Sequence, residues 1–204
     1  MNEIVKNLMS NFQGIKFIML ADGQIDYILD NLVNTLDLPG AVVELGCNVG
    51  MTTTFMQRLL NAVESDKDIH VYESFKGLPE KTEGDGETAS VAGESTVSKQ
   101  DFINTVKLAG LKLPVINEGW FREIPDEQYP DKICFAFFDG DFYSSITDSF
   151  EKVYHKMVPG GIILVHDYAW QNYPGVQKAC EDFLKDKPER MTQEINGIGK
   201  MIKE

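Results

Sequence analysis

The sequence predicts a doubly wound α/β domain with a mostly parallel sheet that ends in an antiparallel hairpin. Short, continuous apolar runs alternate with stretches in which apolar residues recur at helical spacing. Runs of this kind are typical of strands that helices cover on both faces. Near the end of the chain, Asn196-Gly197 is a dipeptide that favours a tight hairpin turn.

The apolar runs and the amphipathic stretches place the individual elements. We expect strands at 41–45, 69–73, 113–117, 133–138 and 161–165. We expect helices at 24–36, 52–63, 98–108, 144–157 and 175–184, and the hairpin within 190–203. Residues 1–38 are interpreted as a helical segment that precedes the sheet. The full length, residues 1–204, suits one domain with a complete core.

The charge balance narrows the class of partner. Nineteen basic and thirty-two acidic side chains give a formal charge of −13. Such a surface repels phosphate backbones and anionic lipid, so we expect neither a nucleic-acid nor a membrane partner. The start of the chain lacks the basic and apolar pattern of a secretory signal, and the three cysteines lie far apart. A cytoplasmic protein that acts on a small molecule is the expectation.

A polar segment, residues 81–97, interrupts the unit between the second and third strands. It is rich in glycine, serine, threonine and glutamate, a composition that favours a mobile loop. Two interpretations are open at this point. The segment is either a lid over a substrate or a surface loop without a role.

The turn after the first strand carries a cofactor signal. Glu44, Gly46 and Gly50 are spaced E-x-G-x-x-x-G, which differs from the dinucleotide fingerprint G-x-G-x-x-G. Gly46 would let the backbone pass close to a ligand, and Gly50 would let the following helix pack close to the strand. The alternative is an ordinary glycine turn.

Two further features strengthen that signal. Glu73 ends the second strand, where a carboxylate can accept hydrogen bonds from both hydroxyls of a ribose. Gly119 and Trp120 follow the third strand, and the indole could form a wall of an adenine pocket. A solvated acid and core packing are the alternatives. The predicted cofactor-binding residues are Glu44, Gly46, Asn48, Gly50, Glu73, Ser74, Gly119, Trp120 and Asp139.

Polar side chains also follow the fourth and fifth strands. Asp139 comes directly after the fourth, and His166 and Asp167 come after the fifth. Neighbouring parallel strands lie about 4.8 Å apart, so their ends bring these three side chains together. Paired carboxylates suit a hard divalent cation, whereas an imidazole favours a softer metal such as Mn²⁺ over Mg²⁺. The alternative is a set of capping acids at strand ends.

Six blocks of the sequence together resemble the macrocin-type O-methyltransferases, which methylate sugar hydroxyls of macrolide and aminocoumarin antibiotics. The order and spacing of the blocks make the resemblance specific over roughly residues 40–185. The blocks are VELG at 43–46, ESFKGLP at 73–79, GWF at 119–121, DGDFYSS at 139–145, PGG at 159–161 and HDY at 166–168.

The resemblance implies a class I, Rossmann-like methyltransferase that depends on S-adenosylmethionine and Mg²⁺. It assigns to Asp139 the roles of metal ligand and catalytic base, and to Asp167 the role of a second ligand. His166 stands where the family has an aspartate, which leaves the identity of the metal open. The expected metal is Mg²⁺ or Mn²⁺. Asp139 and His166 are the predicted catalytic residues; Asp139, His166 and Asp167 are the predicted metal ligands.

These inferences combine into one predicted function with two alternatives. The prediction is methyl transfer to a hydroxyl oxygen of a small molecule such as a sugar, with a divalent metal and Asp139 as base. One alternative is a metal-independent methyltransferase with His166 as base, and the other is a cofactor-binding module without catalysis. The apolar stretch Phe17-Ile18-Met19-Leu20 and the resemblance also predict a homo-oligomer.

Overall fold

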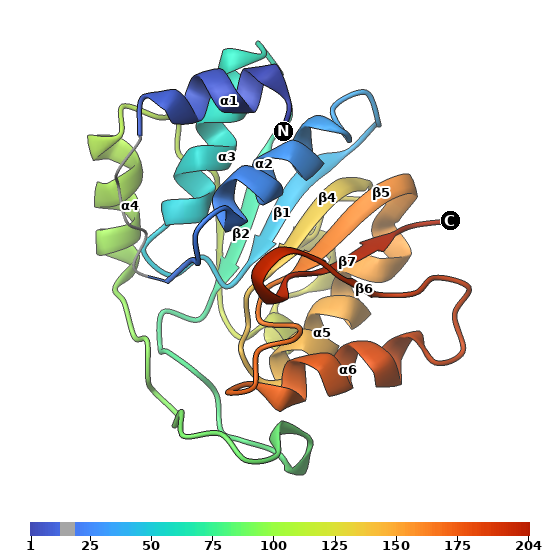
Figure 1. Cartoon of the computed structure of the whole chain (residues 1–204). Helices are drawn as coiled ribbons and strands as arrows, with labels where there is room; N and C mark the ends of the chain where they lie inside the picture. The colour runs from blue at the N-terminus through green and yellow to red at the C-terminus, as the bar shows by residue number, and fades with distance from the viewer. Residues whose placement is uncertain (13–18) are drawn as a thin grey trace.

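The computed structural model describes residues 1–12 and 19–204. Within them, a seven-stranded sheet has the order β3-β2-β1-β4-β5-β7-β6 (Figure 1). Strands β1 to β5 pair in parallel, and β7 pairs antiparallel to both β5 and β6. The strands are β1 Ala41–Leu45, β2 Ile69–Glu73, β3 Val115–Glu118, β4 Ile133–Phe138, β5 Met157–Val165, β6 Thr192–Gln193 and β7 Gly199–Ile202.

Helices cover both faces of the sheet, as the continuous apolar runs predicted. Figure 1 shows α1 to α4 on one face and α5 and α6 on the other. Apolar side chains of the first four helices pack against one side of β1, and those of the last two against the other. The helices are α1 Glu3–Ser10, α2 Gln24–Val33, α3 Met51–Ala62, α4 Lys99–Leu108, α5 Tyr143–Val153 and α6 Pro174–Leu184.

The predicted fold class and the predicted strands are confirmed, with differences at some ends. The third strand begins at Val115, and the fifth already begins at Met157. The helix predicted for 144–157 ends at Val153, because residues 154–156 form a short 3-10 turn and Met157 then pairs with Ile133. Apolar spacing alone does not separate the last turn of a helix from a buried strand that follows it directly.

The terminal hairpin is also confirmed. Asn196 and Gly197 both have positive φ angles, 46° and 84°, as a type I′ turn requires. The backbone N–H of Ile198 donates to the carbonyl of Ile195 at 3.1 Å and closes the turn. Of the helices in residues 1–12 and 19–204, none is both long enough and apolar enough to cross a membrane.

The strand order brings four strand ends to one place. β1 lies between β2 and β4. The strands that follow β1 along the chain, β2 and β3, lie on one side of it, and β4 and β5 lie on the other. Leu45 is level with Tyr72 on one neighbour and with Phe138 on the other, and Phe138 is level with Val165. In sheets of this type, ligands bind in the crevice outside the carboxyl ends at such a switch in strand order.

Candidate active site

A cavity of about 760 Å³ lies at this carboxyl edge of the sheet. Most of the residues predicted for the site line it: Gly46, Asn48, Glu73, Ser74, Trp120, Asp139, His166 and Asp167. Three predicted cofactor residues, Glu44, Gly50 and Gly119, are not among the lining residues of the described chain. The structure therefore joins the two predicted signals, one after β1 and β2 and one after β4 and β5, in one cavity.

Gly46 is required by the backbone of the neighbouring strand. A Cβ atom at this position would lie 2.0 Å from the carbonyl oxygen of Asp139, and the φ angle of Gly46 is +88°. No larger residue fits there without moving β1 and β4 apart. The glycine thus allows the turn after β1 to lie against Asp139, and this contact places both of them at the cavity.

Gly50 and Gly119 have packing roles. Gly50 has a φ angle of +85°, precedes α3, and would place a Cβ atom 2.7 Å from Cε2 of Phe102. The sequence predicted that Gly50 lets α3 pack close to a strand. The close neighbour is instead Phe102 of α4. Gly119 lies against Ile124, because a Cβ atom at position 119 would be 3.1 Å from Cγ1 of Ile124.

Glu44 lies beneath the site and contacts α3 instead of the cavity. Its side chain is buried and accepts a hydrogen bond from the hydroxyl of Thr53. Its strand neighbours Val43 and Leu45 pack with α5 and α6, so Glu44 faces the opposite side of the sheet. Burial raises the pKa of Glu44 to about 8, so this carboxyl group is mostly protonated at neutral pH.

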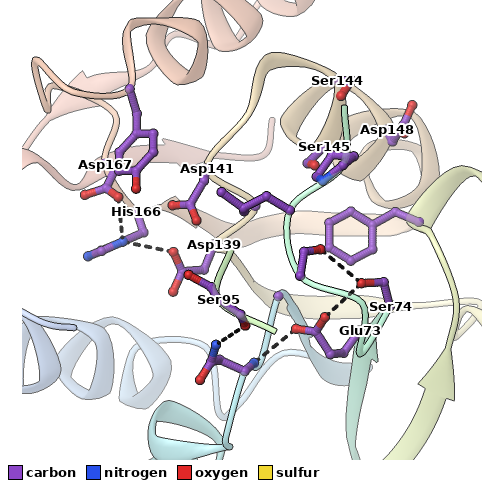
Figure 2. Close-up of a pocket in the computed structure, with 18 of the residues that line it drawn as sticks. Glu73, Ser74, Ser95, Asp139, Asp141, Ser144, Ser145, Asp148, His166 and Asp167 are labelled. Atoms are coloured by element: carbon purple, nitrogen blue, oxygen red, sulfur yellow. Dashed lines mark hydrogen bonds and ion pairs between the residues drawn. The ribbon is translucent and has the colours of Figure 1, made fainter. Parts of the chain in front are cut away.

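Glu73 is held in place by donors from two loops. Its carboxylate accepts from the backbone N–H groups of Asn48 and Phe75, both at 3.1 Å, and from the hydroxyl of Ser74 at 3.3 Å. Asn48 in turn donates from its side-chain amide to the carbonyl of Ser95 at 3.1 Å (Figure 2). These bonds fix the orientation of the carboxylate at the cavity wall, where a ligand with vicinal hydroxyls would meet it.

Asp139, His166 and Asp167 converge on the opposite side of the cavity (Figure 2). One ligand atom from each of the three lies within 4.8 Å of the others. Nδ1 of His166 is 2.9 Å from a carboxylate oxygen of Asp139 and 3.3 Å from one of Asp167. In the described part of the chain, neither carboxylate nor any other group gives Nδ1 a hydrogen bond of good geometry.

The donors of this cluster fit a divalent cation. A buried ring nitrogen without a hydrogen bond faces two carboxylates, and an oxygen–nitrogen–oxygen set suits Mn²⁺ better than an all-oxygen set does. Without a cation, burial lowers the pKa of His166, but the two carboxylates outweigh burial and raise it well above its ordinary value. The negative charge at this point therefore attracts a positive charge, either a proton or a metal.

Asp141 is a site residue that the prediction omitted. It lines the cavity, and burial together with Asp139 and Asp167 raises its pKa to about 8. Its backbone has a φ angle of 58°, which turns the chain sharply after β4. The signal was present in the D-G-D block at 139–141, but the strand pattern pointed only to the first acid.

The polar segment 81–97 borders the cavity and is bonded to the helices beside it. Asp85 is buried and accepts from the backbone N–H of Tyr143 at 2.5 Å. The hydroxyl of Ser90 lies 3.0 Å from that of Tyr173. Thr82 and Ser95 line the cavity. These contacts place the segment at the cavity, while the lid role and the mobility stay predictions.

Some other lining residues come from segments that carried no signal of their own. They include Gln24 at the start of α2 and Trp170 and Tyr173 after β5. In the apolar stretch predicted as an oligomer surface, Met19 and Leu20 line the cavity, whereas Phe17 and Ile18 lie outside the described residues. The homo-oligomer stays a prediction.

Comparison with solved structures places this fold among known methyltransferases. The O-methyltransferase NovP matches with a TM-score of 0.81 and 22% identity, over 91% of this chain and 81% of that one. CalS11, a calicheamicin methyltransferase, matches with a TM-score of 0.73 and 18% identity, over 98% of this chain and 91% of that one.

Comparison of sequences gives relatives that act on natural products. An 8-demethyl-8-(2,3-dimethoxy-alpha-L-rhamnosyl)-tetracenomycin-C 4'-O-methyltransferase of Streptomyces olivaceus is 26% identical over 84% of this chain and 70% of its own length. A mycinamicin III 3''-O-methyltransferase of Micromonospora griseorubida is 24% identical over 72% of this chain. The chain spans 61% of that enzyme and 54% of a demethyldecarbamoylnovobiocin O-methyltransferase of Streptomyces niveus.

Residues 20–202 match the family described as macrocin-O-methyltransferase (TylF). The match extends over nearly the whole chain and includes every residue predicted for the site. The chain therefore belongs to the macrocin O-methyltransferase family and is an S-adenosylmethionine-dependent O-methyltransferase.

Proposed function

We propose that the chain methylates a hydroxyl oxygen of a small, uncharged molecule such as a sugar, with Asp139 as base and a divalent cation beside it. The observation that carries the proposal is the convergence of Asp139, His166 and Asp167 across the cavity from Glu73. One side of the cavity thus offers a ribose-binding carboxylate, and the other offers groups that can handle a hydroxyl proton.

The cofactor would bind along the wall formed by the turns after β1 and β2. When bound, S-adenosylmethionine supplies an electrophilic methyl group on its sulfonium. The fixed carboxylate of Glu73 would accept from the ribose hydroxyls, and Asn48 and Ser74 flank it. Trp120, which lines the same cavity, would cover the adenine with its ring. Gly46 keeps this wall close to Asp139, so a ligand bound there lies next to the acidic cluster.

The chemistry requires an acceptor oxygen that is deprotonated and aligned. Asp139 would remove the hydroxyl proton as the new oxygen–carbon bond forms. A cation held by Asp139, Nδ1 of His166 and Asp167 would lower the pKa of that hydroxyl. Asp141 is a second carboxyl group at the cavity, and its pKa of about 8 makes it protonated over much of the neutral range. A protonated carboxyl group cannot accept the proton, so the base role is not assigned to Asp141.

The contacts of His166 support a ligand role over the alternative in which it is the base. Its Nε2 atom lies 3.2 Å from Oε1 of Gln24, and its Nδ1 atom faces Asp139 and Asp167. The ring is also buried. Both nitrogens are thus directed at protein groups, and an acceptor hydroxyl would reach neither without displacing one of them.

The charge of the lining favours an uncharged acceptor. Seven of the described lining residues carry a carboxyl group, whereas Arg122 is the single arginine and no lysine is present. Arg122 is bonded to Asp148 through two nitrogens at 3.1 Å, so its charge is already matched. A nucleotide-activated sugar would bring phosphates into this negative field and be repelled. A sugar attached to a scaffold without phosphates avoids that repulsion, and the first relative is named for a rhamnosyl group on tetracenomycin C.

The test is turnover with a panel of acceptors. Formation of S-adenosylhomocysteine is followed with mycinamicin III, demethyldecarbamoylnovobiocin and TDP-rhamnose, each with and without Mn²⁺ or Mg²⁺. We expect turnover with at least one of the two glycosides, which carry no phosphate, and little with the nucleotide sugar. Turnover of TDP-rhamnose alone would contradict the acceptor class. Absence of S-adenosylmethionine binding at millimolar concentration in calorimetry would contradict the function as a whole.

A further inference from the structure

Gln24 is a buried amide that contacts the metal-ligand cluster from a different part of the chain. It is the first residue of α2, is 2% exposed, and lies 142 positions before His166 in the sequence. Its Oε1 atom is 3.2 Å from Nε2 of His166. The amide therefore touches the ring nitrogen that points away from Asp139 and Asp167.

Two backbone groups fix which way the Gln24 amide points. The N–H of Ala21 donates to Oε1 at 2.7 Å, and Nε2 of the amide donates to the carbonyl of Asn196 at 2.9 Å. A backbone N–H can only donate, and a carbonyl oxygen can only accept. Rotation of the amide by 180° would place donor against donor and acceptor against acceptor. Oxygen, not nitrogen, therefore faces His166.

The orientation of the amide determines the tautomer of the ring. Because Oε1 can only accept, Nε2 of His166 must carry a proton to make this bond. A neutral ring then has its lone pair on Nδ1, which is the buried atom between Asp139 and Asp167 that has no hydrogen bond among the described residues. A lone pair beside two carboxylates is unfavourable by itself and favourable as a ligand of a cation.

We propose that Gln24 is a positioning residue that holds His166 in the Nε2–H tautomer and so presents Nδ1 to a divalent cation. The inference rests on the proposed metal site. It adds a residue from the start of α2 that acts through the His166 ring and is not itself a ligand of the cation. It also supplies the partner that a ligating histidine requires and a ligating carboxylate does not.

The test compares two variants that lose the same structural bond. Gln24→Met has a similar length and removes all three polar contacts. Gln24→Glu also loses the bond to Asn196, because a carboxylate cannot donate, but it still accepts from Nε2 of His166. Mn²⁺ affinity is measured by the electron paramagnetic resonance signal of free Mn²⁺ in the absence of acceptor. We expect Gln24→Met to weaken Mn²⁺ binding by about 10–100-fold, as is typical for partners of ligating histidines, and Gln24→Glu to stay close to wild type.

A second background separates tautomer control from support of the loops. In His166→Asp the ligand is an oxygen with no tautomer, so Gln24→Met should leave Mn²⁺ affinity there unchanged. This background also reports any effect of the added charge of Gln24→Glu. Equal loss in both Gln24 variants, or a loss that persists with His166→Asp, would show a purely structural role and overturn the proposal.

A third measurement separates this proposal from the function it rests on. Wild-type Mn²⁺ binding with an unaffected Gln24→Met variant would overturn the tautomer role and leave the metal site standing. Absence of Mn²⁺ binding to wild type would overturn both. Calorimetric titration of S-adenosylmethionine without metal tests the methyltransferase independently, and both variants should bind it like wild type.

Discussion

Two buried clusters of charged side chains in this molecule differ in how completely their charges are matched. At the C-terminal end, Glu189 accepts hydrogen bonds from Lys203, from the hydroxyl of Tyr154 at 2.6 Å, and from the backbone N–H of Glu204 at 3.3 Å. At the cavity, Asp139 and Asp167 share a single histidine, whose Nδ1 makes no hydrogen bond among the described residues.

The difference indicates which cluster is structural and which is functional. The Glu189 cluster pairs one carboxylate with one ammonium, and Lys203 also lies 4.7 Å from the centre of the Tyr154 ring. The charges of this cluster are matched without a bound ion. The cavity cluster places several acids around one imidazole, an arrangement that is unfavourable until a cation binds. Folded proteins retain such local imbalance mainly at functional sites.

The largest expected effect comes from removing a carboxylate at the cavity. Asp139→Asn should lower turnover by about 10²–10⁴-fold, because the proposed base is lost. Metal loss would add to this effect. The melting temperature in chelator should change little, because losing a repelling carboxylate offsets losing the Asp139 contact with His166. Turnover and thermal unfolding of the same preparation check both parts, and full activity would remove Asp139 from the mechanism.

The matched cluster should respond in the opposite way. Glu189→Gln should lower the free energy of unfolding by about 3 kcal/mol, because Lys203 is left without its buried partner. Turnover at a temperature where the variant is folded should equal that of wild type. Urea denaturation measures the change, with the exposed Glu127→Gln as control. A stability equal to that of the control would refute the structural role of the cluster.

The stability of the protein at low pH should also depend on the Glu189 cluster, because the pKa of Glu189 is lowered. Burial favours the neutral form of Glu189, but Lys203 and Tyr154 outweigh it and lower the pKa from 4.5 to about 2. A depressed pKa in the folded state stabilises the protein above the unfolded value and is lost as pH falls toward 2. About 2 kcal/mol should disappear between pH 6 and pH 3. Glu189→Gln should lack this part of the acid sensitivity, and an unchanged slope would contradict the assignment.

The smallest effect is stabilisation of the cavity cluster by metal. Mn²⁺ at ten times its dissociation constant should raise the free energy of unfolding by about 1.4 kcal/mol, because only the folded state has the site. Asp139→Asn should lose this gain, whereas Glu189→Gln should retain it. Thermal shift with and without Mn²⁺ measures it, and an equal gain in all three proteins would indicate binding elsewhere.

The features that the sequence predicted are those that follow from local spacing. Buried runs mark the strands, and because parallel strands end at one edge, the sequence alone predicts that Asp139, His166 and Asp167 meet. Alternation along β1 also places Glu44 on the side away from Val43 and Leu45.

The features that the sequence did not predict depend on contacts between distant segments. Gln24 meets His166 only because α2 packs beside the hairpin turn at Asn196. Asp141 enters the cavity through a positive φ angle that its neighbours do not signal. Ser90 and Tyr173, which link the polar segment to the region after β5, are 83 positions apart. Tertiary packing sets such pairs, and no periodicity reports them.

The unmatched cluster at the cavity is proposed as a cation site for methyl transfer. The decisive assay is S-adenosylhomocysteine formation with an accepted glycoside, first in chelator and then after add-back of Mn²⁺, Mg²⁺ or Zn²⁺. We expect loss of turnover in chelator and recovery with Mn²⁺ or Mg²⁺, with His166→Asp shifting the preference toward Mg²⁺. Full turnover in chelator would contradict it.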